Sequence, residues 1–185
     1  MSKIMESEVL IGGIEKREIV IVDYDPIWPN KFLEHKKKIE VALKDSFILI
    51  EHIGSTSVPQ LAAKPIIDII IVVEDSSNEA TYLPTLLDAS YVLRVREPEW
   101  HQHRMVRTPE RDVHAHIFSL GCPEIKRQIA FRNRLRQIDG ERLLYESVKR
   151  QLAKQDWTDM NAYASAKAEV VEQITARALS ESDGI

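Results

Sequence analysis

The chain has 185 residues, of which 44% are hydrophobic and 29% are charged, as is usual for one globular domain in water. The net charge of −4 gives no electrostatic reason to expect a nucleic acid or an anionic membrane as a partner. No apolar run approaches the ~18 residues of a membrane span, residues 1–17 lack the pattern of a signal peptide, and the single Cys122 cannot form an internal disulfide. We therefore expect a cytoplasmic protein without membrane association.

The first half of the chain mixes predicted strands and helices. Residues 1–17 carry mixed charges around Gly12-Gly13, and we expect them to be an N-terminal extension to a single domain that spans residues 18–179. β-branched residues predict the strands, and apolar residues at helical spacing predict the helices. In chain order, the expected elements are a strand at 18–24, a helix at 31–45, strands at 47–53 and 66–73, a helix at 80–89 and a strand at 91–95.

The second half begins with a predicted hairpin and then becomes helical. The expected elements are strands at 103–107 and 113–120 and helices at 124–138, 141–155 and about 158–179. Thr158 or Asp159 can cap the last helix. Because strands and helices mix early and helices dominate late, we expect an α+β fold with a helical C-terminal part from about residue 124.

The turn Gly54-Ser55-Thr56-Ser57 follows the predicted strand at 47–53. Glycine lets another group approach the backbone closely, and hydroxyl and backbone N–H groups can together surround a phosphate. The turn lacks the Gly-Lys-Ser/Thr ending of a P-loop. The same residues are also consistent with a purely structural turn in which Ser55 or Thr56 acts as a helix cap.

One acid, Asp68, interrupts the apolar run from Ile66 to Val73. A buried carboxylate needs a partner, and Lys64, four residues earlier, can either pair with the acid or neutralise a phosphate. Glu51 and His52 end the preceding strand, and alternation places them on opposite faces, so we expect only one of them to face Asp68. The spacing leaves open whether the acid is part of a structural ion pair or a metal ligand.

Two further groups of residues can bind charged ligands. The spacing in His114-Ala115-His116 puts two imidazoles on one face of a strand, where they can hold a divalent metal ion or act as half-buried hydrogen-bonding residues. Arg132 and Arg136 share one face of a helix, and guanidinium groups suit phosphate or carboxylate. A solvated helix face with acidic partners is the alternative for the two arginines.

The motifs resemble, in order, those of the GrpB family. Two stretches of this chain resemble the family signature. They are Glu51-His52-Ile53-Gly54-Ser55-Thr56-Ser57-Val58-Pro59 and, after it, Lys64-Pro65-Ile66-Ile67-Asp68-Ile69. Further similar stretches are Tyr24-Asp25-Pro26 with Trp28 and Phe32, His114-Ala115-His116, Phe131-Arg132-Asn133-Arg134-Leu135-Arg136, and the residues Tyr145, Lys149, Leu152, Tyr163 and Lys167. The resemblance covers about residues 18–179.

This resemblance implies the nucleotidyltransferase superfamily, whose fold is a small mixed sheet flanked by helices. In such enzymes a Gly-Ser turn holds the phosphates, and two Mg²⁺ ions bound by an Asp-x-Asp/Glu pair and a third acid activate the attacking hydroxyl. Carried over to this chain, Gly54 and Ser55 match the turn and Asp68 matches the first acid. The chain departs from the pattern at the second acid, where it has Ile70.

The resemblance therefore leads to two hypotheses. The first is nucleotidyl transfer to an unnamed acceptor, with Asp68 and Glu51 as catalytic acids. Its phosphates would be held by Gly54, Ser55, Thr56, Lys64, Arg132 and Arg136, and its Mg²⁺ by Asp68, Glu51, His114 and His116. The second is a module that binds a nucleotide or another phosphorylated small molecule, or assists a protein partner, and has lost the reaction. A mononuclear metal hydrolase built on Asp68, His114 and His116 is a third alternative.

Overall fold

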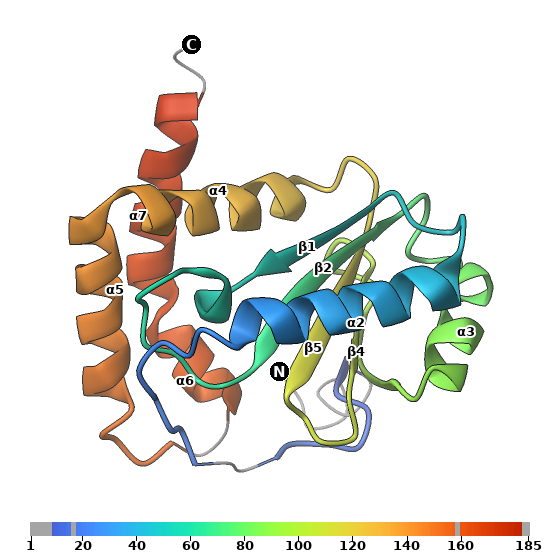
Figure 1. The fold of residues 1–185 in the computed structure, drawn as a ribbon, viewed down its shortest axis with the longest axis horizontal. Helices are drawn as coiled ribbons and strands as arrows, with labels where there is room; N and C mark the ends of the chain where they lie inside the picture. Colours follow the sequence, from blue (N-terminus) through green and yellow to red (C-terminus); the bar gives the residue numbers. More distant parts are fainter. Residues whose placement is uncertain (1–8, 16–17, 158–159, 183–185) are drawn as a thin grey trace.

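The computed structural model describes residues 9–15, 18–157 and 160–182, and its centre is a mixed sheet in the order β1-β2-β5-β4-β3 (Figure 1). The five strands are β1 (Leu49–Ile53), β2 (Ile67–Val73), β3 (Val92–Glu97), β4 (His103–Arg107) and β5 (Val113–Ser119). β2 and β5 are parallel, and the other neighbouring pairs are antiparallel. The α+β class expected from the sequence is confirmed, and so is the predicted hairpin of β4 and β5.

Helices cover both faces of the sheet. They are α2 (Trp28–Leu43), α3 (Leu83–Asp88), α4 (Pro123–Gln137), α5 (Asp139–Leu152), α6 (Met160–Ala166) and α7 (Ala168–Ser182), with short 3₁₀ turns at η1 (Ser55–Ser57) and η2 (Glu79–Thr81). Figure 1 shows α5, α6 and α7 grouped at one end of the domain and α3 at the other. In the described parts of the chain, no helix is both long and apolar enough to cross a membrane.

The central strand β2 is buried on both faces because helices pack on each side of it. Its odd-numbered residues from Ile67 to Val73 belong to the core beneath α2 and α3. Ile70 and Val72 point the other way and pack with Phe118 in a smaller cluster near the start of α4. Asp68 is on this second face by strand alternation, so the acid lies where the sheet meets the C-terminal helices.

The strand predicted at 18–24 is wrong. The segment is extended, but it joins another segment at only one point, where the N–H of Val22 donates to the carbonyl of Ala63 at 2.9 Å. β-branched residues favour an extended backbone, yet a sheet strand also needs a partner strand. This segment lies instead against the loop between η1 and β2, so its backbone pairing does not continue beyond one β-bridge.

The single helix predicted at about 158–179 is also wrong, because the chain turns at Lys167 and forms the two helices α6 and α7. The suggested caps, Thr158 and Asp159, lie outside the described residues. Apolar residues keep their helical spacing across the turn, so the pattern did not reveal it. The turn has a consequence for the site, since Lys167 lines a cavity over the sheet.

The described part of the N-terminal segment lies against the far edge of the sheet. The N–H of Ile11 donates to the carbonyl of Arg94 at 2.9 Å, and the guanidinium group of Arg94 donates to the carbonyls of Ile11 and Gly13. Glu15 forms an ion pair with Arg107 at 2.8 Å. Residues 10–15 therefore border the same face of the sheet as Asp68, and several of them line a cavity that reaches this acid.

Candidate functional site

The strand register gathers the candidate residues on one face of the sheet. Asp68 of β2 lies opposite Ile53 of β1 and His114 of β5. Ile70 in turn lies opposite Glu51 and His116. Residues that are directly opposite in neighbouring strands point to the same side, so Glu51, Asp68, His114 and His116 share the face that carries the C-terminal helices.

Within this set, the structure brings Asp68 and the two histidines together. The distance from Asp68 Oδ1 is 3.8 Å both to His114 Nδ1 and to His116 Nε2. Burial lowers the pKa of His114 to about 4, although the negative charge of Asp68 acts in the opposite direction. Burial alone would raise the pKa of Asp68, but the interaction with His116, together with the charges of His114 and Lys64, keeps the pKa of this carboxyl below its ordinary value. The acid is therefore ionised near neutral pH.

Gly54 brings the η1 turn directly over this carboxylate. Its backbone has φ +69° and ψ −175°, a conformation that is accessible essentially only to glycine. A Cβ atom at this position would lie 2.6 Å from Asp68 Oδ2. The glycine is therefore required twice, once for the conformation of the turn and once for the close approach of the turn to the acid.

The other hydroxyls of the turn hold it in place. Thr56 Oγ1 donates to the carbonyl of Ile66 at 3.0 Å and lies 3.1 Å from His52 Nε2. Ser57 Oγ donates to the carbonyl of Gly54 at 2.6 Å. Burial lowers the pKa of His52 to about 4, so its ring is neutral and can donate to Thr56. These contacts connect the turn to β1 and to the start of β2, so Thr56 stabilises the conformation of the turn.

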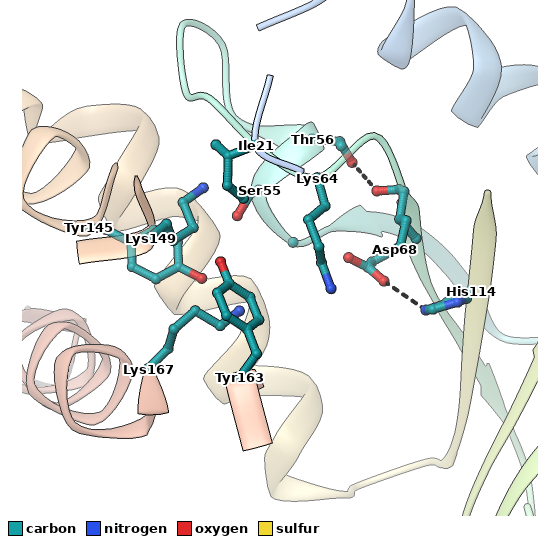
Figure 2. Close-up of a pocket in the computed structure, with 12 residues that line it drawn as sticks. Ile21, Ser55, Thr56, Lys64, Asp68, His114, Tyr145, Lys149, Tyr163 and Lys167 are labelled. Carbon is teal, nitrogen blue, oxygen red and sulfur yellow. Dashed lines mark hydrogen bonds and ion pairs between the residues drawn. The ribbon is translucent and has the colours of Figure 1, made fainter. Parts of the chain in front are cut away.

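A cavity of about 140 Å³ opens beside the turn, between the sheet and helices α5 and α6 (Figure 2). We call it the lysine pocket, and its polar lining consists of Ser55, Thr56, Lys64, Asp68, His114, Tyr145, Lys149, Tyr163 and Lys167. Two of the lysines lie close to one aromatic ring, with Lys64 Nζ and Lys167 Nζ 5.3 and 4.6 Å from the centre of the Tyr163 ring. Three lysines thus line a pocket whose described lining contains one carboxylate, Asp68.

The lysines are strongly affected by burial. Lys149 is only 2% exposed, and burial, assisted by the positive charge of Lys167, lowers its pKa from 10.5 to about 7. Its ammonium group donates to the carbonyl of Ala62 and lies 4.7 Å from the centre of the Tyr145 ring. Burial also lowers the pKa of Lys167, although the charge of Asp68 acts to raise it. The pocket holds positive charge at an energetic cost.

Two larger cavities meet the lysine pocket at Asp68. One, of about 290 Å³, lies between the sheet and residues 10–15 and shares Lys64, Asp68 and His114 with it. The other, of about 430 Å³, extends between α4 and α7 and shares Gly54, Asp68 and Lys167 with it. A ligand whose charged group lies in the lysine pocket therefore has two directions in which its remaining part can extend.

Three of the residues predicted for the site do not line the lysine pocket but stabilise the strand and turn beside it. Arg132 Nη1 donates to Glu51 Oε2 at 2.6 Å and to the carbonyl of His52 at 2.8 Å. Arg136 donates two hydrogen bonds to the carbonyl of Ser57, at 3.0 and 2.7 Å. The two arginines hold α4 against β1 and the turn. Glu51 is occupied by Arg132, and no interaction among the described residues joins it to Asp68.

The sequence reasoning did not assign a ligand-binding role to the groups contributed by the C-terminal helices, Tyr145, Lys149, Tyr163 and Lys167. A signal for them is present in the sequence, because tyrosine is followed four residues later by lysine in two successive helical segments. That spacing puts each lysine beside its tyrosine on one helix face. The repeated spacing could have indicated that both helical segments contribute side chains to the same site.

The donor groups do not fit the two Mg²⁺ ions that the resemblance implies. Mg²⁺ takes oxygen ligands in octahedral geometry, and the groups nearest to Asp68 on this face are imidazole nitrogens. Ile70, at the position of the second acid, is fully buried and apolar. The other carboxylates that line the three cavities within the described chain are engaged, Glu15 by Arg107 and Glu124 and Glu172 by Arg127. The described side chains around Asp68 therefore do not fit a two-Mg²⁺ centre.

The fold and the site define an α+β domain with a glycine turn over a half-buried acid, and comparisons identify its family. Residues 18–177 match the model of the family described as GrpB protein, so the chain belongs to the GrpB family. It is 49% identical over 169 residues to a UPF0157 protein of Streptomyces coelicolor, covering 91% of this chain and 89% of the other. It is 44% identical over 173 residues to a UPF0157 protein of Halalkalibacterium halodurans, covering 92% and 89%.

A solved structure shows the same fold. The conserved protein GrpB from Enterococcus faecalis is 33% identical and superposes with a TM-score of 0.79, covering 88% of this chain and 98% of the other. A more distant similarity, at 26% identity over 180 residues, covers 83% of this chain and 44% of a dephospho-CoA kinase of Mycolicibacterium paratuberculosis. The family resemblance found in the sequence is confirmed.

We predict that Gly54→Ala destabilises the protein more than a glycine replacement that adds backbone strain alone. Gly121→Ala is the matched control, because Gly121 also has a positive φ of 82° but nothing within 4 Å of an added Cβ atom. The control should lose about 1–2 kcal/mol of unfolding free energy and Gly54→Ala about 2–4 kcal/mol, since its Cβ also meets the Asp68 carboxylate. Urea denaturation measures both, and equal losses would show that the turn can move away from the acid.

We also predict that Lys149 makes stability depend on pH. Between its folded pKa of about 7 and its ordinary value of 10.5, the unfolded chain binds a proton that the folded chain does not. The free energy of unfolding contributed by this group therefore rises as pH increases from 7 towards 10.5. In denaturation series at several pH values, Lys149→Met should show a weaker rise than the wild type, whereas the exposed Lys31→Met should follow the wild type. Parallel curves for all three proteins would contradict the assignment.

Proposed function

We propose that this protein binds a phosphorylated small molecule, with a phosphate group in the lysine pocket. The observation that supports this most strongly is the convergence of Lys64, Lys149 and Lys167 on one cavity whose described lining has a single acid. Ammonium groups that line one pocket repel one another, and a bound phosphate relieves this repulsion by offering several charged oxygens. Anion binding is the chemistry for which the pocket is best arranged.

The neutral groups of the pocket support the same ligand. The hydroxyl of Tyr163 is buried without a hydrogen-bond partner in the described chain, and it lines the lysine pocket. An unpaired buried hydroxyl costs free energy unless a ligand satisfies it. Ser55, at the start of the turn, contributes a further hydroxyl and interacts with Tyr145. Phosphate oxygens can accept hydrogen bonds from each of these groups.

The size of the pocket indicates which part of a ligand it takes. A volume of about 140 Å³ is several times the ~30 Å³ share of one water molecule, which suits a phosphate or a short phosphate chain rather than a whole nucleotide. The base and sugar of a nucleotide would extend past Asp68 into one of the two larger cavities. A nucleotide or a similar phosphate ester therefore remains the class of ligand that we propose.

We propose binding rather than nucleotidyl transfer as the function. The transfer reaction expected from the superfamily needs two metal-bound acids beside the phosphates, and Ile70 and the Arg132-bound Glu51 do not provide them. A module that assists another protein is a second candidate, favoured by the similarity to chains named dephospho-CoA kinase. The two candidates are compatible, because a pocket for a phosphate ester could serve such a partner.

We predict that phosphate compounds raise the melting temperature of the protein in the presence of EDTA. Inorganic phosphate, pyrophosphate, ATP and dephospho-CoA form the test panel, each measured with and without Mg²⁺. Lys167→Gln should weaken binding of the best compound by about tenfold or more, because it removes one of three convergent charges. Lys31→Gln, on the exposed side of α2, should bind like the wild type. No shift with any compound, or unchanged binding by Lys167→Gln, would disprove the proposal.

Binding should also take up a proton. A phosphate beside Lys149 favours its charged form and raises its pKa from about 7, so at about pH 8 part of the bound population gains a proton from the buffer. Calorimetric titrations in two buffers of different ionisation enthalpy should give an uptake of between zero and one proton. Lys149→Met should abolish most of this uptake. Proton release in the wild type would contradict a phosphate at this position.

A further inference from the structure

Three arginines form a second group of positive charges, which we call the arginine cluster. They are Arg94 of β3, Arg107 at the end of β4, and Arg111 in the loop that joins β4 to β5. Arg94 and Arg107 line the cavity of about 290 Å³ that reaches Asp68, but neither of them lines the lysine pocket. The phosphate-binding function proposed above makes no use of this cluster.

The carboxylate of Glu15, from the N-terminal segment, lies at the centre of the arginine cluster. Arg107 Nη1 and Nη2 donate to its two oxygens at 2.9 and 2.8 Å, and Arg111 Nη1 is 3.4 Å from one of them. The hydrogen bonds from Arg107, together with the charges of all three arginines, lower the pKa of Glu15 to about 2, although burial acts to raise it. The cluster therefore already holds one anionic group, which comes from the chain itself.

One carboxylate does not satisfy the arginine cluster. Arg94 is buried, and burial, together with the positive charges of Arg107 and Arg111, lowers its pKa against the effect of Glu15. The guanidinium group of Arg94 donates to two backbone carbonyls of the N-terminal segment, which carry no formal charge. Nε of Arg107 is buried without a hydrogen-bond partner in the described chain. Positive charge and donor capacity thus remain in excess beside the cavity.

A phosphate group matches the arginine cluster better than the side chain of Glu15. A phosphate ester carries more negative charge than a carboxylate and has a third acceptor oxygen. It could accept from Nε of Arg107 as well as from the Nη groups, and guanidinium groups bind phosphate through such paired hydrogen bonds. The space is available, because Glu15 lines the cavity and its side chain would leave room when displaced.

We propose that the arginine cluster is a second phosphate-binding site, and that Glu15 occupies it in the free protein in place of a ligand. Phosphate that binds at the cluster displaces the Glu15 carboxylate from Arg107. Lys64 lines both this cavity and the lysine pocket, so a ligand with two separate phosphate groups could bind at both sites at once. Only this last step, which concerns the class of ligand, rests on the function proposed above.

Phosphate binding by Glu15→Gln tests the second site without any knowledge of the natural ligand. The full-length protein is titrated calorimetrically with inorganic phosphate at constant ionic strength in the presence of EDTA. We expect the affinity to rise about tenfold over the wild type, because the carboxylate that competes for Arg107 is lost. Glu110→Gln, at an exposed position in the loop that carries Arg111, removes the same charge and should bind like the wild type. Unchanged affinity in Glu15→Gln, or an equal gain in Glu110→Gln, would overturn the proposal.

Second substitutions in the Glu15→Gln protein decide where the additional phosphate binds. Arg107→Gln should remove the gain, whereas Lys167→Gln should keep it, since Lys167 lines the lysine pocket but not this cavity. A gain that is lost with Lys167→Gln and kept with Arg107→Gln would refute the arginine site. Arg111→Gln, at an exposed position, should reduce the gain, and an unchanged gain there decides against the proposal if Arg107→Gln does not fold. Failure of the lysine-pocket proposal alone would leave the gain intact.

Discussion

The structure depends on the contact between Gly54 and the carboxylate of Asp68. No other residue type could occupy the turn without meeting this acid, since an added Cβ would lie 2.6 Å from Asp68 Oδ2. The contact fixes the position of the η1 turn, which borders the lysine pocket, relative to β2. The hydrogen bonds from Thr56 to Ile66 and from Arg136 to Ser57 hold the turn in this position. The positions of Ser55 and Thr56 relative to Asp68 follow from this close approach.

Arginine and lysine have different tasks around the turn. Arg132 and Arg136 bind backbone carbonyls and Glu51, where the planar guanidinium group can satisfy several acceptors at once. Lys149 is instead buried and Lys167 half-buried beside tyrosine rings, and burial lowers the pKa of both ammonium groups. The arginines give the site a permanent shape, and the lysines give it a charge that responds to a ligand.

The sequence predicted those features that depend on neighbouring residues. The apolar runs before the turn and around Asp68 predicted β1 and β2, and the spacing of His114 and His116 correctly placed both imidazoles on one face. The direction of Glu51 depended on Arg132, which is 81 residues away in the chain, and so alternation could give its face but not its partner. The lysine pocket was missed for the same reason, because its charges come from helices that tertiary packing brings to the turn.

The face of β2 that carries Asp68 is polar at Asp68 and apolar at Ile70. At Asp68 the strand faces cavities, but two residues later it is covered by Ile53, Val72 and Phe118. A second carboxylate at that position would be buried in an apolar cluster without a partner, which is strongly unfavourable. The absence of a second acid at this position therefore agrees with the apolar packing between the sheet and the start of α4. Around Asp68 the other groups that can carry a charge in the lysine pocket are therefore the imidazole of His114 and the ammonium groups of the lysines, which is why the proposed ligand is an anion.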